Sequence, residues 1–433
     1  MSRPIDAFTA GRFGEPHAGA LDVIRRRALG GAIYYLSHIA RRDPRLWVFG
    51  NHKGFRDNPR YLAEHIANEH PEIAAWWVAA DAGEADQARS AGLRVVMRAT
   101  RDGVGIQHQA GVAFLSNAFM DLQAPYLGGA FIVHLFHGTP LKRVLLDMEA
   151  MRAEPGSYLA RVSRSVHRWS VRRRLRQVDM VAAGGDLART RFISAFGLPP
   201  DRVRALGSPR FDVILGGPAY DRVSRGDLRA RLGLKPSDRA VVWLPTWRED
   251  GDAGWLPKMR SDEVETLLAG SGVTLLVKIH PYSDIGVYRQ RLSEHRSIRL
   301  LHEADEDVNC LLRVADALVT DYSSAVFDYA LLQRPIHFFA PDAGDYRGGR
   351  GLYEPYDHLT GGRHHVAWAP LLAELAASAR GGGGDGGPGL EHARRVAGLA
   401  GNCGAPGSSE RIVRAVADAV GIEARDLGVA GER

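Results

Sequence analysis

Short runs of apolar, β-forming residues recur along the first half of the chain, each separated from the next by polar or helix-like sequence. We expect strands at residues 46–50, 74–80, 93–97, 112–115, 131–137 and 180–183. Helical spacing follows several of these runs, for example over residues 59–68 and 187–195. Strands that alternate with helices in this way are typical of a parallel α/β sheet.

The same alternation starts again in the second half, where it predicts strands at residues 240–244, 274–279, 298–301, 317–320 and 335–339. We therefore predict an α/β fold with two doubly wound parallel-sheet domains, at residues 45–218 and 219–378, which face each other. Open α/β sheets bind their ligands at the carboxyl ends of the strands, so the cleft between the domains is the expected site.

Three further segments lie outside the two predicted domains. Residues 1–44 form a basic N-terminal segment, residues 379–390 a Gly-rich linker, and residues 391–433 a C-terminal helical segment. Within the last of these, residues 408–420 have the apolar spacing of one helix, with Ser408 as its N-cap. We expect this final helix to pack back on the body of the protein.

Composition narrows the class of protein only a little. The 433 residues are 45% hydrophobic and 24% charged, as in ordinary globular proteins, and the net charge of +6 is compatible with anionic ligands. The two cysteines support neither a disulfide framework nor a Cys-rich zinc site. We expect no secretory signal at the N-terminus, and the longest apolar stretch, residues 28–40, is too short to span a bilayer.

The stretch FIVHLFHGTPLKR, residues 131–143, combines a predicted strand with unusual chemistry at its end. The strand stops on His137, and Gly138, Thr139 and Lys142 follow within a tight turn. An imidazole, a hydroxyl and an ammonium at the carboxyl end of a parallel strand suit an anionic ligand. We assign a functional role to His137, whereas Lys142 could equally be a solvated surface charge.

Loops after the strands of the second half carry more groups that suit phosphate. They are Thr246, Arg248, Lys278, His280, Thr320, Asp321, Ser323, Ser324 and Arg350. A helix that starts at the two serines would direct backbone N–H groups and hydroxyls at an anion. Each residue also has a plainer interpretation: the serines as an ordinary N-cap, His280 as a structural histidine, and Asp321 as a residue that orients a loop.

Six motifs, taken in order, resemble those of the CDP-glycerol glycerophosphotransferases, which are teichoic-acid and capsule polymerases and primases. They are HGTPLK (137–142), GSPRFD (207–212), LPTWR (244–248), KIHP (278–281), TDYSSAVFDY (320–329) and RGLY (350–353). The likeness covers about residues 45–421. It implies a GT-B-like fold, with two Rossmann-like domains and the active site in the cleft between them.

The resemblance also implies a reaction and its residues. Glycerol phosphate, or a related polyol phosphate, would pass from CDP-glycerol or CDP-ribitol to a hydroxyl of a lipid-linked or polyol-phosphate acceptor, with release of CMP. The family's two functional histidines match His137, which we expect to be the catalytic base, and His280. The predicted substrate-binding residues are Gly138, Thr139, Lys142, Arg210, Thr246, Arg248, Lys278, Thr320, Asp321, Ser323, Ser324 and Arg350.

Two departures from the family pattern concern specificity. Lys278 stands where the family often has arginine, which replaces a planar fork with a point charge. The sequence LTGG (359–362) stands where the family often has Leu-Pro-Gly, which leaves the shape of the acceptor loop open. No cofactor is expected, and because no cluster of carboxylates follows a strand, we expect no metal ion in the reaction.

A basic amphipathic helix is predicted at about residues 158–178. Seven arginines and no acidic residue lie between positions 161 and 176. A solvated face or a nucleic-acid patch would share this pattern, but arginines opposite a tryptophan favour an anionic membrane surface or a polyanion. The expected contact residues are Arg161, Arg164, Arg168, Trp169, Arg172 and Arg173. We expect a peripheral protein on the cytoplasmic face of the cell membrane.

Two functions other than glycerol phosphate transfer share part of the sequence pattern. A GT-B glycosyltransferase that uses a nucleotide sugar would share the fold, and fold alone does not fix function. A basic nucleic-acid-binding protein would share the charge, but the sequence has no helix-turn-helix, zinc-finger or RNA-recognition signature, so we expect no nucleic-acid partner. The sequence does not decide which polyol is used, whether the protein primes or extends a polymer, what the acceptor is, or how many chains associate.

Overall fold

The computed structural model describes most of the chain. The described residues are 20–117, 119–151, 157–216, 224–248, 251, 264, 266–280, 282–292, 295–301, 307–344, 351–379, 387–401 and 406–427. Arg350, which the sequence predicts to bind the substrate, lies outside the described residues, as does most of the predicted linker at residues 379–390.

The first domain is built on a seven-stranded sheet in which neighbouring strands are parallel and follow the order β3-β2-β1-β4-β5-β6-β7. The strands are β1 (Asp43–Phe49), β2 (Ala74–Ala79), β3 (Arg94–Met97), β4 (Ala110–Leu115), β5 (Phe131–His134), β6 (Met180–Ala183) and β7 (Val203–Ala205). The pattern predicts all of these except β7, a three-residue strand with two exposed positions.

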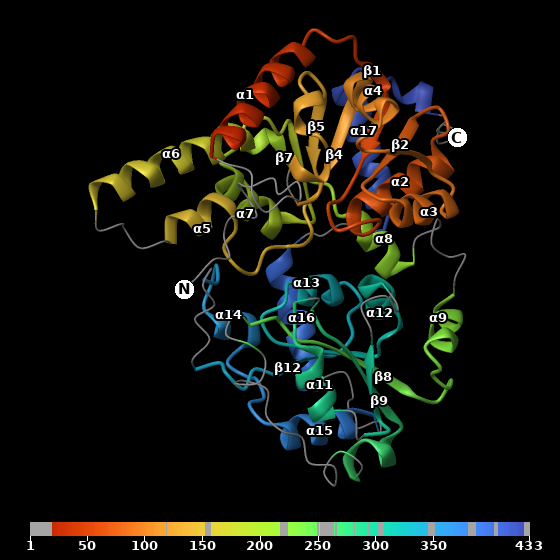
Figure 1. The fold of residues 1–433 in the computed structure, drawn as a ribbon. Helices are drawn as coiled ribbons and strands as arrows, with labels where there is room; N and C mark the ends of the chain where they lie inside the picture. Colours follow the sequence, from red (N-terminus) through yellow and green to blue (C-terminus); the bar gives the residue numbers. More distant parts are fainter. Residues whose placement is uncertain are drawn as a thin grey trace.

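Helices cover both faces and the ends of this sheet (Figure 1). They are α1 (Ala20–Ser37), α2 (Asp57–Glu69), α3 (Ala82–Ser90), α4 (Arg101–Gln109), α5 (Leu145–Met151), α6 (Tyr158–Leu175), α7 (Asp186–Phe196) and α8 (Pro209–Leu215). Figure 1 shows α6 projecting sideways from this domain, next to the end of α1.

The second domain is built on a five-stranded parallel sheet with the order β10-β9-β8-β11-β12. The strands are β8 (Arg239–Leu244), β9 (Val273–Lys278), β10 (Ile298–Leu301), β11 (Ala317–Thr320) and β12 (Ile336–Phe338). Its helices are α9 (Arg225–Arg231), α11 (Ile285–Leu292), α12 (Val308–Val314), α13 (Ala325–Ala330), α14 (Tyr356–Thr360), α15 (Trp368–Ala377) and α16 (Pro388–Ala400). All five strands stand where the sequence predicts them.

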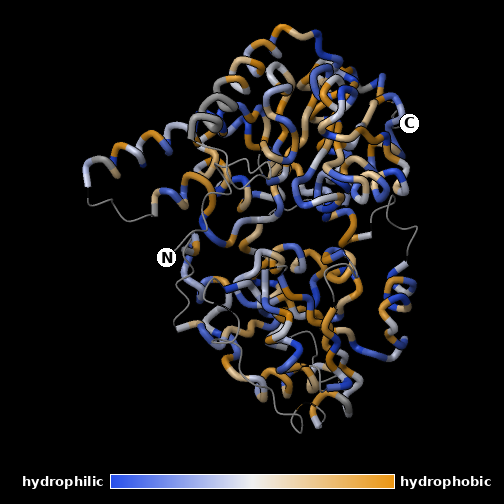
Figure 2. The backbone as a smooth tube through the Cα atoms, in the orientation of Figure 1, coloured by the Kyte–Doolittle hydropathy of each residue, from blue (hydrophilic) through white to orange (hydrophobic). Residues whose placement is uncertain are grey.

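Burial on both faces explains why the strands read as continuous apolar runs. In β1, the side chains of Trp47 and Phe49 enter the core on one face of the sheet, and those of Leu46 and Val48 enter the core on the other. Alternate residues of a strand point to opposite faces, so a strand covered on both sides must be apolar throughout. Hydrophobic positions line these strands in Figure 2. The predicted α/β fold with two parallel-sheet domains is confirmed.

The last long helix, α17 (Ser408–Ala419), returns to the first domain and completes its core (Figure 1). Ile412, Val413 and Val416 of α17 are fully buried in the same cluster as Trp47 of β1. The helix therefore packs back on the body as expected, against the first domain. The predicted N-cap is wrong by one residue, because Ser408 is the first residue of α17 and Gly407 is its N-cap.

Asp212, the last residue of the GSPRFD motif, holds the start of α17. Its carboxylate oxygens accept hydrogen bonds from the backbone N–H groups of Gly407, Ser408 and Ser409 at 2.7, 2.9 and 2.8 Å. A carboxylate at a helix N-terminus satisfies donors that have no partner within the helix and complements the helix dipole. Asp212, although it belongs to a motif of the predicted site, therefore anchors the distant helix α17.

Candidate active site

The strand that leads into HGTPLK ends earlier than the sequence predicts, and a turn presents the histidine. β5 stops at His134, because Phe136 adopts a positive φ of 52° that a strand cannot continue. The Phe136 N–H donates to Nδ1 of the buried His134 at 3.1 Å. The predicted strand end at His137 is thus wrong by three residues, and His137 lies in the turn itself.

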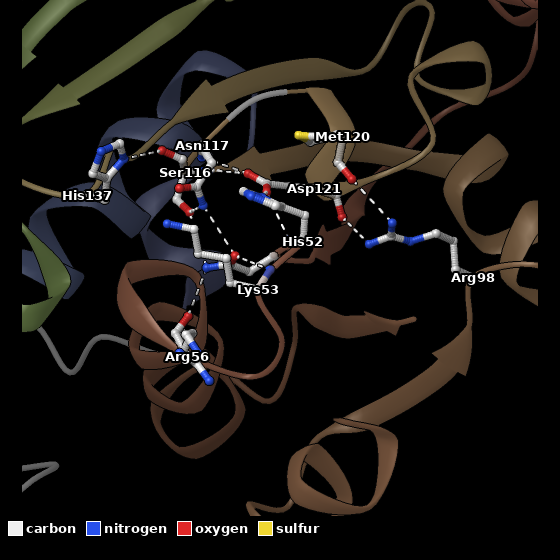
Figure 3. Close-up of polar contacts among 10 residues, drawn as sticks. His52, Lys53, Arg56, Arg98, Ser116, Asn117, Met120, Asp121 and His137 are labelled. Carbon is white, nitrogen blue, oxygen red and sulfur yellow. Dashed lines mark hydrogen bonds and ion pairs between the residues drawn. The ribbon is translucent and has the colours of Figure 1, made fainter. Parts of the chain in front are cut away.

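The contacts of His137 orient its ring. Nδ1 lies 3.3 Å from the carbonyl oxygen of Ser116, to which it donates its proton (Figure 3). The ring stacks on Phe136, with the two centroids 4.3 Å apart. A neutral imidazole carries one proton, so Nε2 keeps its lone pair. This tautomer is the one that a general base requires.

The electrostatic surroundings keep His137 neutral. Desolvation between the domains, followed by the charges of Lys53 and Arg210, lowers the pKa of His137 to about 4. The ring still has an exposed face, where water moderates the shift. With or without this moderation, the pKa of His137 stays below its ordinary value. The imidazole is therefore uncharged at neutral pH and can accept a proton.

A buried carboxylate shapes the loop behind His137. Asp121 accepts hydrogen bonds from the backbone N–H groups of Ser116 and Asn117, both at 2.8 Å, and from Nδ1 of His52 at 2.8 Å (Figure 3). Burial alone would raise the pKa of Asp121, but these hydrogen bonds outweigh it and keep the pKa below its ordinary value. Asp121 thereby fixes Ser116, whose carbonyl orients His137.

Asn58 joins the HGTPLK turn to the GSPRFD motif. This fully buried residue donates from Nδ2 to the carbonyl of Phe136 at 2.8 Å. Its Oδ1 accepts from the hydroxyl of Ser208 at 2.8 Å and from the N–H of Arg210 at 3.1 Å. One amide side chain therefore sets the relative position of two motifs that lie about 70 residues apart in the sequence.

The turn after His137 lies against the start of α13 in the second domain. A Cβ placed on Gly138 would come 3.1 Å from Oγ of Ser324 and 3.2 Å from Nη2 of Arg210, and Gly138 has a φ of 148°. Arg210 in turn makes a buried ion pair with Asp328 of α13, at 2.9 Å. The structure thus brings together the predicted Gly138, Arg210 and Ser324 from opposite domains.

A second contact between the domains follows directly along the chain. Lys142 forms an isolated antiparallel bridge with Leu352, flanked by backbone hydrogen bonds from Arg143 to Gly351 at 2.9 Å and from Tyr353 to Leu141 at 3.1 Å. Because backbone groups of both domains pair here, the HGTPLK segment is held on both sides of the domain boundary. Thr139, also predicted to bind the substrate, is buried between these two contacts.

The carboxyl edge of the second sheet contains a closed polar network. Asp321 is fully buried and accepts from the N–H and the hydroxyl of Thr246, at 3.0 and 2.6 Å. Arg248 pairs with Asp321 at 2.9 Å and with Asp342 at 2.8 Å. Desolvation would lower the pKa of Arg248, but the two carboxylates raise it. These contacts match the plainer interpretation of Asp321, and they direct Arg248 into the protein.

The remaining predicted residues of the second domain stand at the same edge. The Thr320 hydroxyl donates to the carbonyl of Leu244 at 3.1 Å, and the Ser323 hydroxyl accepts from the N–H of Ala325 at 3.3 Å. Ser324 makes no side-chain cap bond within α13. Lys278 is the last residue of β9 and is half-buried.

An aromatic group surrounds His280, which is exposed beyond the end of β9. The Tyr282 N–H donates to Nδ1 of His280 at 3.2 Å, so Nε2 carries the proton and can donate. The rings of Trp247 and Tyr282 lie with centroids 6.3 and 5.1 Å from the imidazole. Trp247 stands in the LPTWR motif and Tyr282 directly follows KIHP, but residue type alone does not distinguish these two aromatic residues from core residues.

The predicted basic helix forms as α6, with its N-cap at Ser157. Arg161, Arg172, Arg173 and Trp169 are exposed, whereas Arg164 and Arg168 are half-buried. Arg173 donates to the hydroxyl of Tyr35 in α1 and lies over the ring of Trp169, at 5.4 Å. In the described part of the chain, no helix combines the length and apolarity that a transmembrane span requires.

Comparison with known proteins gives the family of the chain. Residues 33–380 match the family of CDP-glycerol:poly(glycerophosphate) glycerophosphotransferases. A teichoic acid poly(glycerol phosphate) polymerase of Staphylococcus epidermidis is 28% identical over 349 residues, which are 77% of this chain and 46% of the relative. The polymerase of the same description from Bacillus subtilis is 25% identical over 321 residues, 71% of this chain and 40% of the relative.

The chain therefore spans about half the length of the curated relatives that it matches. Its fold is similar to that of the wall teichoic acid polymerase TagF, with a TM-score of 0.70, 22% identity, and coverage of 92% of this chain and 95% of that one. The GT-B-like arrangement that the motifs imply is thereby confirmed at the level of the fold. Because four-fifths of its length matches this family, the chain belongs to the CDP-glycerol:poly(glycerophosphate) glycerophosphotransferases.

Proposed function

We propose that this protein transfers glycerol phosphate from CDP-glycerol to a hydroxyl of a lipid-linked or polymeric acceptor and releases CMP. The observation that carries the proposal is the contact between the turn that follows His137 and the start of α13, where Gly138 meets Ser324. A base from one domain and phosphate-binding groups from the other would then act on the same molecule.

In the proposed reaction, an acceptor oxygen attacks the phosphorus next to glycerol, and the bond from that phosphorus to the bridging oxygen of CDP-glycerol breaks. The hydroxyl proton passes to Nε2 of His137, whose tautomer is set by the Ser116 carbonyl. CMP leaves with the electron pair of the broken bond. Phosphoryl transfer depends mainly on positioning and on stabilisation of charge, so a single base is sufficient.

The second domain would hold the donor. The Nε2–H of His280, the hydroxyls of Ser323 and Ser324, and Lys278 stand at the carboxyl edge of the sheet, as a diphosphate requires. Arg248 would shape this edge through its ion pairs with Asp321 and Asp342. Trp247 and Tyr282 offer rings against which a cytosine base could stack.

The acceptor would be presented at a membrane surface. Val162, Val166 and Trp169 of α6 are 44%, 59% and 60% exposed and lie on one helical stripe, with arginines beside them. Tyr35, Leu36 and Ile39 in and after α1 add exposed apolar side chains, and the Arg173–Tyr35 hydrogen bond joins the two elements. Apolar and cationic groups on one projection suit the cytoplasmic face of an anionic membrane.

The substitution His137→Ala tests the assignment of the base. CMP release from CDP-glycerol should fall by at least about 100-fold, because general-base catalysis contributes about 10²- to 10⁴-fold. The affinity for CDP-glycerol, measured by calorimetry, should stay within about threefold of that of the unaltered protein.

The matched control is His108→Ala, which removes a half-buried histidine of α4 away from the domain boundary. It should leave turnover unchanged. Loss of CDP-glycerol binding in His137→Ala with chemistry retained at saturation would refute the role. Parallel assays with CDP-ribitol and with UDP-sugars separate the choice of polyol and the glycosyltransferase alternative.

A further inference from the structure

Two histidines and a glutamate meet where α2 of the first domain packs on the returning helix α17. Nε2 of His70 and Nε2 of His65 lie 2.8 and 3.3 Å from the same oxygen, Oε2 of Glu410. The three possible ligand atoms all lie within 4.8 Å of one another. Since His70 ends α2 and Glu410 stands in the first turn of α17, the group joins elements about 340 residues apart.

His70 faces acceptors on both sides of its ring. Nδ1 lies 3.2 Å from Oε1 of Glu72 and 3.3 Å from the carbonyl oxygen of Leu427, opposite the contact of Nε2 with Glu410. A neutral imidazole has one proton and cannot donate to both sides. With its proton on Nδ1, donated to Glu72 or to the carbonyl of Leu427, His70 would direct the lone pair of Nε2 toward Glu410, where a metal ion could bind.

The hydrogen-bond acceptors at Nδ1 of His70 resemble those found beside metal-binding histidines. A histidine ligand usually donates its other N–H to a carboxylate or a backbone carbonyl, which fixes the tautomer and the ring orientation. Glu72 and Leu427 supply both kinds of acceptor to His70. The side chain of His70 is buried, whereas His65 and Glu410 are half-buried, so an ion from solvent can reach the group.

Glu410 is prepared as an ionised ligand. Both histidines contact the same carboxylate oxygen, Oε2. Nε of Arg414 binds the other oxygen, Oε1, at 2.6 Å, which leaves Oε2 directed at the two histidines. With Glu72, two carboxylates surround the group against the one guanidinium of Arg414.

The distances suit a small tetrahedral ion. Zinc with bonds of about 2.1 Å places neighbouring ligand atoms about 3.4 Å apart. The separation of 3.3 Å between His65 Nε2 and Glu410 Oε2 already has this value, and the 2.8 Å contact of His70 would open by about half an ångström when zinc replaces the proton. Two imidazoles and one carboxylate favour zinc over magnesium or calcium, which prefer oxygen ligands.

We propose that His65, His70 and Glu410 bind one Zn²⁺ ion, with water as the fourth ligand, and that the ion fastens α17 to α2. The site is separate from the residues assigned to glycerol phosphate transfer, and its role is structural. Glu72 acts as a positioning residue through the ring of His70.

Among the described residues, His337, His365 and Glu374 form a second group of two histidines and a glutamate. It differs from the first in the carboxylate oxygens that the histidines contact. His337 Nδ1 and His365 Nε2 contact different oxygens of Glu374, at 2.7 and 2.9 Å, so that each histidine has its own acceptor. The buried Nε2 of His337 has no hydrogen-bond partner, so no second acceptor stands behind that ring as Glu72 stands behind His70. This group therefore serves as the internal control.

The binding test uses the full chain, freed of metal with a chelator and titrated with Zn²⁺ in competition with a chromophoric indicator. We expect one tight equivalent per chain. His65→Gln should weaken that affinity at least about 100-fold and Glu72→Gln about 10-fold, whereas His365→Gln should leave it unchanged. An affinity that survives His65→Gln, or that His365→Gln removes, overturns the proposal.

Thermal unfolding tests the structural role. Saturating Zn²⁺ should raise the Tm of the metal-free protein by about 3 °C or more, and should leave the Tm of His65→Gln unchanged. Turnover of CDP-glycerol by His65→Gln should equal that of the unaltered protein. Co²⁺ in place of Zn²⁺ should give the strong visible absorption of a tetrahedral site. Stoichiometric Zn²⁺ binding without any change in Tm would contradict the fastening of α17.

Discussion

The imidazole of His137, the proposed base, is oriented by groups that include one far from it in the sequence. The Ser116 carbonyl selects the tautomer, and the Phe136 ring holds the plane of the imidazole. Lys53 and Arg210 add positive charge nearby, which disfavours the imidazolium. The same cations would attract a diphosphate, so one arrangement would serve both the proposed base and the proposed donor.

The pH dependence of turnover follows from this arrangement. Because the pKa of His137 in the folded protein lies below its ordinary value of 6.5, the base is fully active at neutral pH and is lost only as the pH falls through the lowered pKa. The acidic limb of kcat/KM for CDP-glycerol should therefore have an apparent pKa below 6.5. An acidic limb at pH 7 or above would show that a different group titrates.

Some site residues could be recognised from sequence and others could not. His137, Gly138 and Ser324 stand in short motifs where a strand gives way to a turn or a helix, and the fold brings Gly138 and Ser324 together. Asp121 and Asn58 gave no such signal, because a buried polar residue is defined by its tertiary partners. Arg248 was expected to bind the substrate, but it pairs with Asp342, which lies 94 positions away and cannot be recognised as its partner from the sequence.

At the scale of elements, periodicity identifies strands better than it fixes their ends. The runs of apolar residues predict all five strands of the second sheet, because burial on both faces leaves little freedom in residue type. The end of β5 was misplaced because LFH continues the apolar pattern after the backbone has turned at Phe136. Helix α6 was predicted from its arginines and its apolar stripe, but its projection from the domain depends on α1 and α5, which the pattern does not place (Figure 1).

The exposed stripe of α6 predicts binding to anionic vesicles in co-sedimentation. The combined substitution of Val162, Val166 and Trp169 by alanine should reduce binding at least about 10-fold, because it removes the apolar area that would enter the interface. Raised salt should also release the unaltered protein, since its arginines are solvent-exposed.

The control for this experiment is Arg89→Gln on α3, which removes an exposed arginine from the opposite part of the same domain. It should leave vesicle binding unchanged. Equal binding by the triple variant of α6 would assign the membrane contact to another surface.

At the scale of the whole molecule, Asp212 links α8 of the first domain to the distant helix α17. Asp212→Asn leaves one acceptor oxygen for three backbone donors, so the free energy of unfolding should fall by about 1–3 kcal/mol. Denaturant unfolding followed by circular dichroism measures the change. The control is Asp426→Asn, which alters an exposed ion pair with Arg45 and should cost less than about 1 kcal/mol. Equal effects of the two substitutions would argue against the anchoring role of Asp212.

The return of α17 to the first domain has a consequence for synthesis on the ribosome. Residues that form β1 emerge early, but Trp47 stays without part of its packing until Ile412 and Val416 have been translated. Domains generally fold as they emerge, whereas here the core of the earlier of the two domains is completed only when α17 has been made. During that interval the nascent chain exposes an apolar face of its sheet, and it would need a chaperone or a rapid completion of translation to avoid aggregation.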